Sequence, residues 1–259
     1  MTQSTLTYYP SDDFDQKKLQ ETLFSPLEDI DIYEELVIFP LKQFKKIAAV
    51  ASGETFIDFS LSNVFQLELF TNGFNNINIL RASDSSIEDV KKWMKKEQAA
   101  SVSSQIVAAL VGSSDWKENV ESLRQKNPQI VKWDTEKGDP TKPFQLKEAD
   151  CVVCMFILDL ISKTPEDFHS NILKIASMLG VGKRFFLCGL LNCTHITING
   201  LSLRVLPYDD HMVRRALLKA GIFVLNFDMK RSNVKSNIVK CTVYYSDHSK
   251  RLIQRASKF

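Results

Sequence analysis

Glycine is scarce in this sequence, since only 9 of the 259 residues are Gly. That is about half of the usual share. Enzymes built on a doubly wound α/β sheet place glycines in the turns that face a ligand, because only Gly lets the backbone come so close to it. The shortage of glycine therefore bears directly on function.

The sequence also lacks a strong excess of either charge and a long hydrophobic run. Lys and Arg number 33 against 31 Asp and Glu, so the charge gives no reason to expect a nucleic-acid partner. No hydrophobic segment approaches the length that spans a membrane, and the first ten residues lack the apolar centre of a secretory signal. We therefore expect no transmembrane segment.

The cysteines do not form the pattern of a disulfide scaffold or a metal site. There are five of them, an odd number, scattered among apolar residues, which favours a reducing compartment and a cytoplasmic protein. Cys151 and Cys154 are three apart on a predicted strand, so their side chains point to opposite faces and cannot bind one ion together. The histidines, His169, His195, His211 and His248, show no ligand spacing. We expect no metal.

Length and composition favour one globular domain. The chain is 44% hydrophobic and 25% charged, as is usual for a protein with a buried core, and 259 residues suit a single α/β domain. We expect residues 1–50 to form a helical arm or lid and residues 51–259 to form a Rossmann-like core.

Short apolar segments alternate with helical ones from residue 56 onward. Strands are predicted at residues 56–59, 77–80, 130–133, 149–156, 184–189, 221–227 and 239–245. Helices are predicted at residues 27–49, with interruptions at Pro26 and Pro40, and at 64–72, 86–100, 116–125, 165–179 and 210–220. The alternation predicts a mostly parallel sheet with helices on both faces. A short polar connection before the last strand predicts an antiparallel hairpin at the C-terminal end.

Two of these helices have clear end signals. Thr164 precedes Pro165 and two acids, a combination typical of a helix N-terminus. Asp209 or Asp210 is a candidate N-cap for the helix that follows, and Gly221 is placed to end that helix.

The turn after the first predicted strand has no glycine. Asp58 stands near the end of that strand, and Ser60, Leu61 and Ser62 follow where a nucleotide-binding turn would have glycines. The strand–turn–helix architecture of a cofactor enzyme is thus predicted without the residues that admit the cofactor.

Several segments resemble one family. Residues 89–97, Asp-Val-Lys-Lys-Trp-Met-Lys-Lys-Glu, resemble the helix after the second strand in the small-amine N-methyltransferases, which include nicotinamide, phenylethanolamine and indolethylamine N-methyltransferases. Residues 131–134 resemble a family strand that ends in Cys-Asp-Val. Residues 148–159 resemble the family's Ala-Asp-Cys-Val strand with its Leu-Asp pair. Leu206-Pro207, followed by a helix that ends at Gly221, matches the family's late helix.

The resemblance implies an α/β class I S-adenosylmethionine-dependent methyltransferase fold, with the cofactor at the carboxyl ends of the first strands. The family's Asp-Ile-Gly-Ser-Gly corresponds to Asp58-Phe-Ser-Leu-Ser62, so side chains stand where the methionine part of the cofactor approaches backbone. The acid that would accept both ribose hydroxyls corresponds to Arg81, which can only donate.

Four more positions correspond to the cofactor side of the family's site. Phe65 stands for a tyrosine and lacks its hydroxyl, and Met155 stands for a threonine. Asp134, which the resemblance places by the adenine, is retained, and Thr135 replaces the valine after it. The family's N-terminal tyrosines, which close over the cofactor, have no convincing counterparts.

Three positions correspond to the substrate side. Gly189 stands for an aspartate and His195 for a tyrosine, while Asp159 belongs to the retained Leu-Asp pair. Asp159 can be a catalytic acid or a helix or loop cap, and without the cofactor turn we favour the cap. For His195 we favour a loop histidine over a general base.

Three functions remain open. The favoured hypothesis is a degenerate family member, a pseudoenzyme without catalytic residues or cofactor, that acts by protein interaction or altered ligand binding. The alternative is an active S-adenosylmethionine-dependent N-methyltransferase of a small amine or pyridine, since methyl transfer mainly requires positioning. A carrier that binds another small metabolite in the vacated cleft is the third.

Overall fold

The computed structural model describes residues 7–10, 34–61, 66–96, 116–198, 201–231 and 242–250. Seven strands form one sheet in the order β3-β2-β1-β4-β5-β9-β8. They are β1 (Gly53–Ser60), β2 (Phe74–Arg81), β3 (Gln129–Lys132), β4 (Ala149–Met155), β5 (Leu179–Leu191), β8 (Ile222–Arg231) and β9 (Thr242–Lys250).

The sheet is parallel from β3 to β5, and β9 is antiparallel to both of its neighbours. The predictions of a mostly parallel sheet and of an antiparallel C-terminal hairpin are therefore confirmed. The last strand enters the sheet between β5 and β8, whereas the dinucleotide-binding sheets continue in the order 3-2-1-4-5-6.

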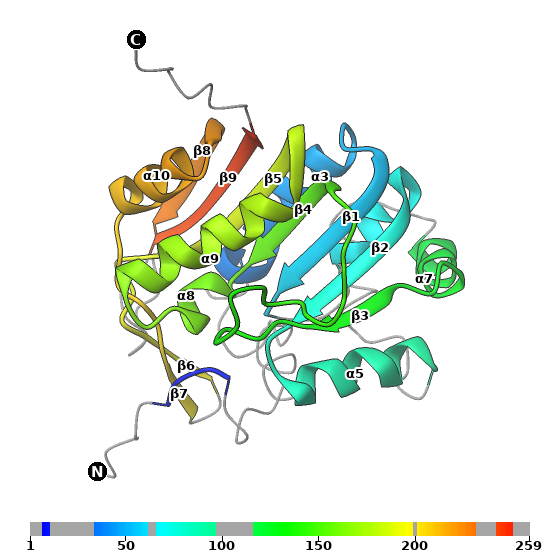
Figure 1. Ribbon diagram of the computed structural model, residues 1–259, viewed down its shortest axis with the longest axis horizontal. Coiled ribbons are helices and arrows are strands. Elements are labelled where there is room, and N and C mark those ends of the chain that lie inside the picture. Colours follow the sequence, from blue (N-terminus) through cyan, green and yellow to red (C-terminus); the bar gives the residue numbers. More distant parts are fainter. Residues whose placement is uncertain are drawn as a thin grey trace.

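Helices cover both faces of the sheet. α9 (Pro165–Met178) and α10 (Asp210–Lys219) lie in front of it and α3 (Phe39–Ala48) lies behind it (Figure 1). The remaining helical segments are η1 (Glu34–Ile38), α4 (Leu67–Phe70), η3 (Thr71–Gly73), α5 (Asp84–Met94), α7 (Trp116–Gln125) and α8 (Leu158–Ile161). Most side chains of β1, β2 and β4 are buried on both faces, which explains why these strands contain nearly continuous apolar runs.

An aromatic cluster joins β1 to the helices behind the sheet. The rings of Phe56 and Phe70 stack with their centroids 4.8 Å apart, and Phe74 lies 5.2 Å from Phe56. Phe44 of α3 meets Phe70 edge to face at 6.3 Å. All four rings are buried, and the burial of this area is a main contribution to folding.

The predicted helix ends are confirmed. Thr164 and Asp167 form a reciprocal capping box at the start of α9, and the Asp209 carboxylate accepts a hydrogen bond from Met212 N at the start of α10. Gly221 follows α10 with a φ of 74°, a left-handed conformation that favours glycine.

Pro40, expected to interrupt a helix, instead lies in the first turn of α3, where its missing N–H has no helical partner to lose.

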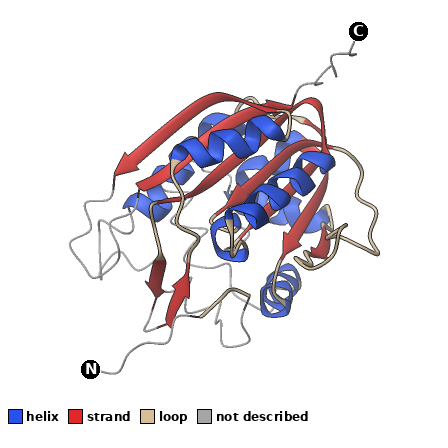
Figure 2. Cartoon of the chain, turned by 60° about the vertical axis from the view of Figure 1, so that its left-hand side comes forward, coloured by secondary structure: helices blue, strands red, loops and turns tan. Residues whose placement is uncertain are grey.

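A second, two-stranded sheet was not predicted. β6 (His195–Ile198) and β7 (Leu201–Arg204) pair antiparallel and stand apart from the large sheet (Figure 2). Thr7 forms a bridge with Leu203 of this ribbon. Residues far apart in the sequence therefore meet beside the β6–β7 ribbon.

Several predicted boundaries were wrong. β5 begins at Leu179 and continues to Leu191, so it is longer than the predicted 184–189 at both ends. Phe156, predicted as strand, has a φ of 52° and lies in the turn after β4. α5 begins at Asp84, two residues before the prediction, while the expected extension through residue 100 lies outside the described residues.

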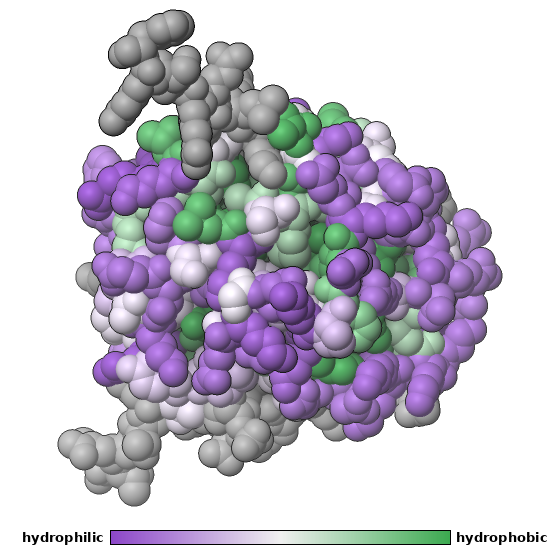
Figure 3. Space-filling view, in the orientation of Figure 1, coloured by the Kyte–Doolittle hydropathy of each residue, from purple (hydrophilic) through white to green (hydrophobic). Residues whose placement is uncertain are grey.

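The surface seen from the side of α9 and α10 is mostly hydrophilic, with small hydrophobic patches among polar side chains (Figure 3). Among the described residues, no helix combines the length and the apolar character needed to cross a membrane.

Candidate functional site

The strand order reverses between β1 and β4, because β2 and β3 lie on one side of β1 while β4 and β5 lie on the other. Open α/β sheets bind ligands at such a point, beyond the carboxyl ends of the strands. Here Ser60 pairs with Met155 in register, and the N–H of Leu61 donates to the carbonyl of Met155 at 2.9 Å. The side chains of Ser60, Leu61 and Met155 are all buried.

A buried ion pair lies beside this point. Arg81 Nη1, from the end of β2, donates to Asp58 Oδ2, from β1, at 2.7 Å. The side chain of Arg81 is only 2% exposed and that of Asp58 is fully buried. Arg81 Nη1 also donates to its neighbouring carbonyl, Leu80 O, at 2.7 Å. The guanidinium therefore lies back against the sheet and pairs with the next strand.

The carboxylate of Asp58 is surrounded by donors. Its Oδ1 accepts hydrogen bonds from Ser60 Oγ at 2.8 Å and from Gln66 Nε2 at 3.0 Å. Together with Arg81, three donors satisfy one buried carboxylate, and this pairing offsets the large cost of removing the two charges from water. Two buried atoms of the same cluster, Arg81 Nη2 and Gln66 Oε1, have no hydrogen-bond partner among the described residues.

Two predicted positions of the cofactor turn, Ser62 and Phe65, lie outside the described residues. Gln66, which begins the next helical segment and is fully buried, was not selected from the sequence. A glutamine at a helix start is usually exposed, so only its bond to Asp58 reveals its role.

A pocket of about 330 Å³ lies at the carboxyl ends of β2 and β3, and Ser83, Asp134 and Thr135 are among the residues that line it. Asp134 forms an ion pair with Lys137 at 3.0 Å, and the hydrogen bond from Lys137 is the main cause that lowers the pKa of Asp134 below its ordinary value. Asp134 and Thr135 therefore both line this pocket.

Trp133 and Phe59 fill the sheet next to this pocket. Their rings stack with centroids 4.5 Å apart and both are buried. The indole Nε1 of Trp133, a donor, has no hydrogen-bond partner among the described residues. Trp133 belongs to the lining of the pocket, which is an unusual place for a donor without an acceptor.

Tyr9 contributes to the same end of the sheet, although no convincing counterpart of the family's N-terminal tyrosines was found in the sequence. Its hydroxyl donates to Ser83 Oγ at 3.3 Å and lies 3.4 Å from Ser86 Oγ, and its ring is buried. Ser83 Oγ is itself the cap of α5, since it accepts from Ser86 N. Tyr9 and Pro10 therefore lie at the carboxyl end of β2.

Asp159 lies at the substrate side of the site, in the first turn of α8. We expected this carboxylate to cap a helix or a loop. Instead it accepts hydrogen bonds from Leu190 N of β5 at 2.7 Å and from the hydroxyl of Tyr208, and it does not cap α8. The side chain thus ties α8 to β5 and to the segment before α10. Burial raises the pKa of Asp159 to about 7, against the opposing effect of these hydrogen bonds.

Gly189 lies directly against this pair. A Cβ atom added at Gly189 would stand 2.8 Å from both carboxylate oxygens of Asp159 and from the hydroxyl of Tyr208. Such a distance is too short for a side chain, so glycine is required here for space. Asp159 and Tyr208 therefore occupy the volume that a side chain at position 189 would need.

His195 is half-buried in β6, and its Nδ1 lies 3.1 Å from the hydroxyl of Thr194. No described hydrogen bond or ion pair brings it to Asp159, Arg81 or Asp134. The structure therefore separates the predicted residues into three groups: Asp58, Ser60 and Arg81 with Leu61 and Met155; Asp134 with Thr135; and Asp159 with Gly189.

The four cysteines that the structure describes form no candidate site. Cys151, Cys154, Cys188 and Cys193 are all buried thiols, and burial raises the pKa of Cys154 and Cys188 above the ordinary value, which makes them poor nucleophiles. In the part of the chain that the structure describes, no three His, Cys, Asp or Glu side chains are arranged to hold a metal ion.

Proteins of known structure share this arrangement. An S-adenosylmethionine-dependent methyltransferase from Methanosarcina mazei has a TM-score of 0.54 at 12% identity, covering 80% of this chain and 97% of that one. The N-methyltransferase NodS from Bradyrhizobium japonicum, solved with S-adenosylhomocysteine, has a TM-score of 0.53 at 6% identity, covering 91% and 97%. The cyclase SpnF reaches 0.55 at 10% identity, covering 96% and 99%. The fold is that of the class I methyltransferases, a fold that also carries other chemistry.

The sequence identifies the family within that class. A model of the NNMT/PNMT/TEMT family matches residues 4–246, and the chain belongs to this family. Human nicotinamide N-methyltransferase is 25% identical over 205 residues, 76% of this chain and 78% of the relative. Rabbit (Oryctolagus cuniculus) indolethylamine N-methyltransferase is 25% identical over 174 residues, 65% of this chain and 66% of the relative. Human phenylethanolamine N-methyltransferase is 26% identical over 178 residues, which span 66% of this chain and 63% of the relative.

Proposed function

We propose that this protein is a catalytically degenerate member of its family, a pseudoenzyme that uses the methyltransferase fold for protein interaction or for binding an altered ligand. The observation that carries the proposal is the buried ion pair between Asp58 and Arg81 at the carboxyl ends of β1 and β2. It commits two side chains to each other at the place where the family resemblance implies cofactor contacts.

The residues at this place do not fit S-adenosylmethionine. A ribose with two hydroxyls needs an acceptor at the end of β2, and a guanidinium has five donors and no acceptor. The carboxylate of Asp58 cannot replace that acceptor, because it already accepts from Arg81, Ser60 and Gln66. Two lost hydrogen bonds to a charged acceptor amount to about 3–6 kcal/mol, which equals roughly two to four decades of affinity.

The turn after β1 supports the same proposal. Ser60 stands where the family pattern has glycine, and a close approach between backbone and ligand requires the absence of a Cβ atom. Leu61 stands where the pattern has serine; it is bonded to β4 through its N–H and buries a bulkier side chain.

One observation favours the second candidate, an active S-adenosylmethionine-dependent N-methyltransferase of a small amine or pyridine. Asp134 is retained and lies in a pocket of about 330 Å³ at the expected end of the sheet. Methyl transfer depends chiefly on the position of the nucleophile, so an active site would need no additional acid or base.

The proposal includes a small metabolite or a protein as the partner, no nucleic acid, and a cytoplasmic location. The buried thiols suit a reducing compartment. The near balance of 33 basic and 31 acidic residues provides no field for nucleic acid.

Isothermal titration of the purified chain with S-adenosylhomocysteine tests the proposal, with NodS as the positive control, since that methyltransferase was solved with the same compound. We expect no heat of binding at ligand concentrations up to about 1 mM, which corresponds to less than about 4 kcal/mol of binding free energy. A dissociation constant near micromolar would contradict the pseudoenzyme and make a screen of amines and pyridines for methylation the next experiment.

A further inference from the structure

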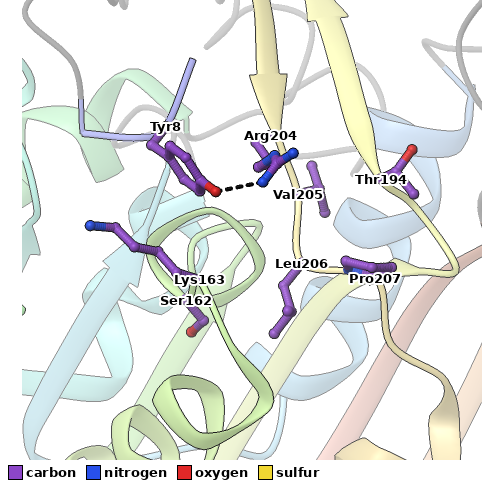
Figure 4. Close-up of a pocket in the computed structure, with 8 residues that line it drawn as sticks. All are labelled: Tyr8, Ser162, Lys163, Thr194, Arg204, Val205, Leu206 and Pro207. Carbon is purple, nitrogen blue, oxygen red and sulfur yellow. Dashed lines mark hydrogen bonds between the residues drawn. The ribbon is translucent and has the colours of Figure 1, made fainter. Parts of the chain in front are cut away.

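A second pocket, of about 260 Å³, lies between the end of α8, the end of β5 and the segment after β7. Ser162 and Lys163 approach it from the α8 side and Thr194 from the β5 side (Figure 4). Arg204 approaches from the end of β7, Leu206 from the segment after it, and Tyr8 from the N-terminal segment. Because β4 and β5 are parallel, the pocket is at the ligand-binding edge of the sheet but away from the Asp58–Arg81 pair.

Two cations surround one aromatic ring at this pocket. The guanidinium carbon of Arg204 is 5.1 Å from the centroid of the Tyr8 ring, and Lys163 Nζ is 5.7 Å from it. Arg204 Nη1 also donates to the Tyr8 hydroxyl at 2.5 Å. Cation–π contacts of this kind hold both side chains beside the pocket and leave most of their N–H donors available for another acceptor.

A hydroxyl group adds to these donors. Ser162 is buried, and its Oγ accepts from Asn171 Nδ2 at 3.1 Å. A hydroxyl that accepts one hydrogen bond still has its own proton to donate. Thr194 also lines the pocket, but its hydroxyl lies 3.1 Å from His195 Nδ1, so Ser162 is the hydroxyl that adds a donor.

No described residue that lines this pocket has a carboxylate. Asp159 is adjacent in the sequence to the lining segment, but its carboxylate is bonded to Leu190 N and Tyr208. Asp167 uses its carboxylate to accept from the N–H groups of Lys163 and Thr164 in the capping box. The lining is therefore positive, in contrast to a pocket that would attract an ammonium group.

The rest of the lining is apolar. Val205 and Leu206 are buried, and Pro207 completes the same stretch. This combination of a cationic end and an apolar floor matches a ligand with an anionic head on a small hydrophobic body. The volume is below the range of about 300–1,000 Å³ that drug-sized ligands use, so the body is no larger than about one ring.

We propose that this pocket binds a small organic anion, in which a carboxylate or phosphate contacts Lys163 and Arg204 and an aromatic or aliphatic body lies on Val205 and Leu206. The inference rests on the altered-ligand form of the proposed function and names the chemical class of that ligand. The proposed ligand carries the opposite charge to the amine substrate of the second candidate function.

Isothermal titration of the full chain with benzoate, phenyl phosphate and benzylamine tests this assignment. The three probes share a ring of the same size and differ in the charged head. We expect benzoate or phenyl phosphate to bind with a dissociation constant of about 1 mM or lower, and the tighter of the two to identify the preferred anion. We expect no binding of benzylamine. Equal binding of benzylamine, or no heat from either anion at ten times that concentration, would overturn the proposal.

Variants connect the binding to the two cations. Lys163→Gln and Arg204→Gln should each raise the dissociation constant of the preferred anion at least about tenfold, since each removes a charge-assisted hydrogen bond. Lys42→Gln, on the exposed side of α3, removes the same charge elsewhere and should leave it unchanged. Both pocket residues are exposed, so their variants should fold, as unaltered thermal melts would verify. If the Arg204 and Lys163 variants bind as the parent does, the assignment is wrong.

The double variant Lys163→Glu/Arg204→Glu provides a gain of binding instead of a loss. It should accept benzylamine and reject benzoate if the two side chains set the charge preference. The titration with S-adenosylhomocysteine is independent of these results: anion binding without S-adenosylhomocysteine binding supports both proposals, and anion binding together with it refutes the pseudoenzyme alone. Failure of the anions refutes the pocket assignment alone.

Discussion

At the scale of single residues, the site is organised by two carboxylates with opposite surroundings. Asp58 is buried against the positive charge of Arg81 and two further donors. Asp159 is equally buried but bonded to neutral groups, the N–H of Leu190 and the hydroxyl of Tyr208. The first is stabilised as an ion pair, whereas for the second burial dominates and raises the pKa.

Breaking the ion pair should destabilise the fold strongly. We expect Arg81→Met to lower the free energy of unfolding by about 3–5 kcal/mol, because it leaves the Asp58 carboxylate buried without its cation. That corresponds to a fall of roughly 10 °C in the melting temperature, which calorimetry can measure.

The double variant Asp58→Asn/Arg81→Met is the control for that prediction. It removes both charges, so it should recover a large part of the loss, as replacement of buried ion pairs by neutral groups often does. If the double variant is less stable than Arg81→Met, the loss arises from packing rather than from an unpaired charge.

The raised pKa of Asp159 predicts how stability depends on pH. The folded-state pKa of about 7 lies above the unfolded value of about 3.9. Between these two values the unfolded chain releases the proton and the folded chain keeps it, so this residue's contribution is complete below pH 4. It is lost by up to about 1.4 kcal/mol per pH unit as the pH rises to about 7.

The variant Asp159→Asn tests this dependence by urea unfolding between pH 4 and pH 8. An amide keeps one acceptor and does not ionise, so the difference in stability between variant and parent should shift in favour of the variant by roughly 4 kcal/mol across that range. Asp84→Asn, on an exposed carboxylate, is the control and should show no such trend. A constant difference for Asp159→Asn would show that the carboxyl has an ordinary pKa.

The sequence predicted these residues unequally, and the reason is physical. Arg81 was recognisable because a cation stood where the family resemblance implies an acid, and Asp58 because it ends a buried strand. Tyr208 was not, because it lies 49 positions from the carboxylate that it contacts and no local pattern marks such a contact. The pairing of Asp58 with Arg81 likewise needed the structure, since it depends on the guanidinium turning back toward the next strand.

At the scale of elements, local sequence signals predicted the capped helix ends well and predicted short strands poorly. α9 and α10 begin where their caps predicted, and α10 ends just before Gly221 as expected. The β6–β7 ribbon escaped prediction because each strand has only four residues, too few for alternation to be distinctive. A usable signal was nonetheless present, since Asn199-Gly200 stands between them and Asn-Gly is typical of a hairpin.

The capping box of α9 gives a prediction at this scale. Thr164→Ala removes the acceptor for Asp167 N and should lower the free energy of unfolding by about 1 kcal/mol. Thr164→Ser keeps the hydroxyl and should remain close to the parent in the same urea titration. An alanine variant as stable as the parent would mean that water satisfies the N–H groups at this exposed helix end equally well.

At the scale of the whole molecule, the position of β9 determines how the large sheet is completed. β9 pairs with β5 from Arg184 to Leu191 and with β8 from Ile222 to Arg231. No other described strand pairs with β8. The last strand in the sequence thus joins the edge strand β8 to the parallel part of the sheet at β5.

A chain that ends at residue 241 should therefore fail to unfold cooperatively. It lacks both strand pairings of β9, so β8 has no partner and the edge of β5 is open to other chains. A chain that ends at residue 250 keeps every described pairing and should unfold in a single transition in calorimetry. Cooperative unfolding of the shorter chain would show that β8 and α10 pack on β5 without β9.

The same position of β9 has a consequence for synthesis on the ribosome. The four strands β1 to β4, and β5 beside β4, can assemble as soon as they emerge, because the neighbours of each are close to it in the sequence. β8 cannot join them, since the strand that separates it from β5 is translated after it. Until Lys250 has left the ribosome, the edge of β5 that β9 will cover stays exposed on the nascent chain. We expect chaperone binding to be strongest during this interval.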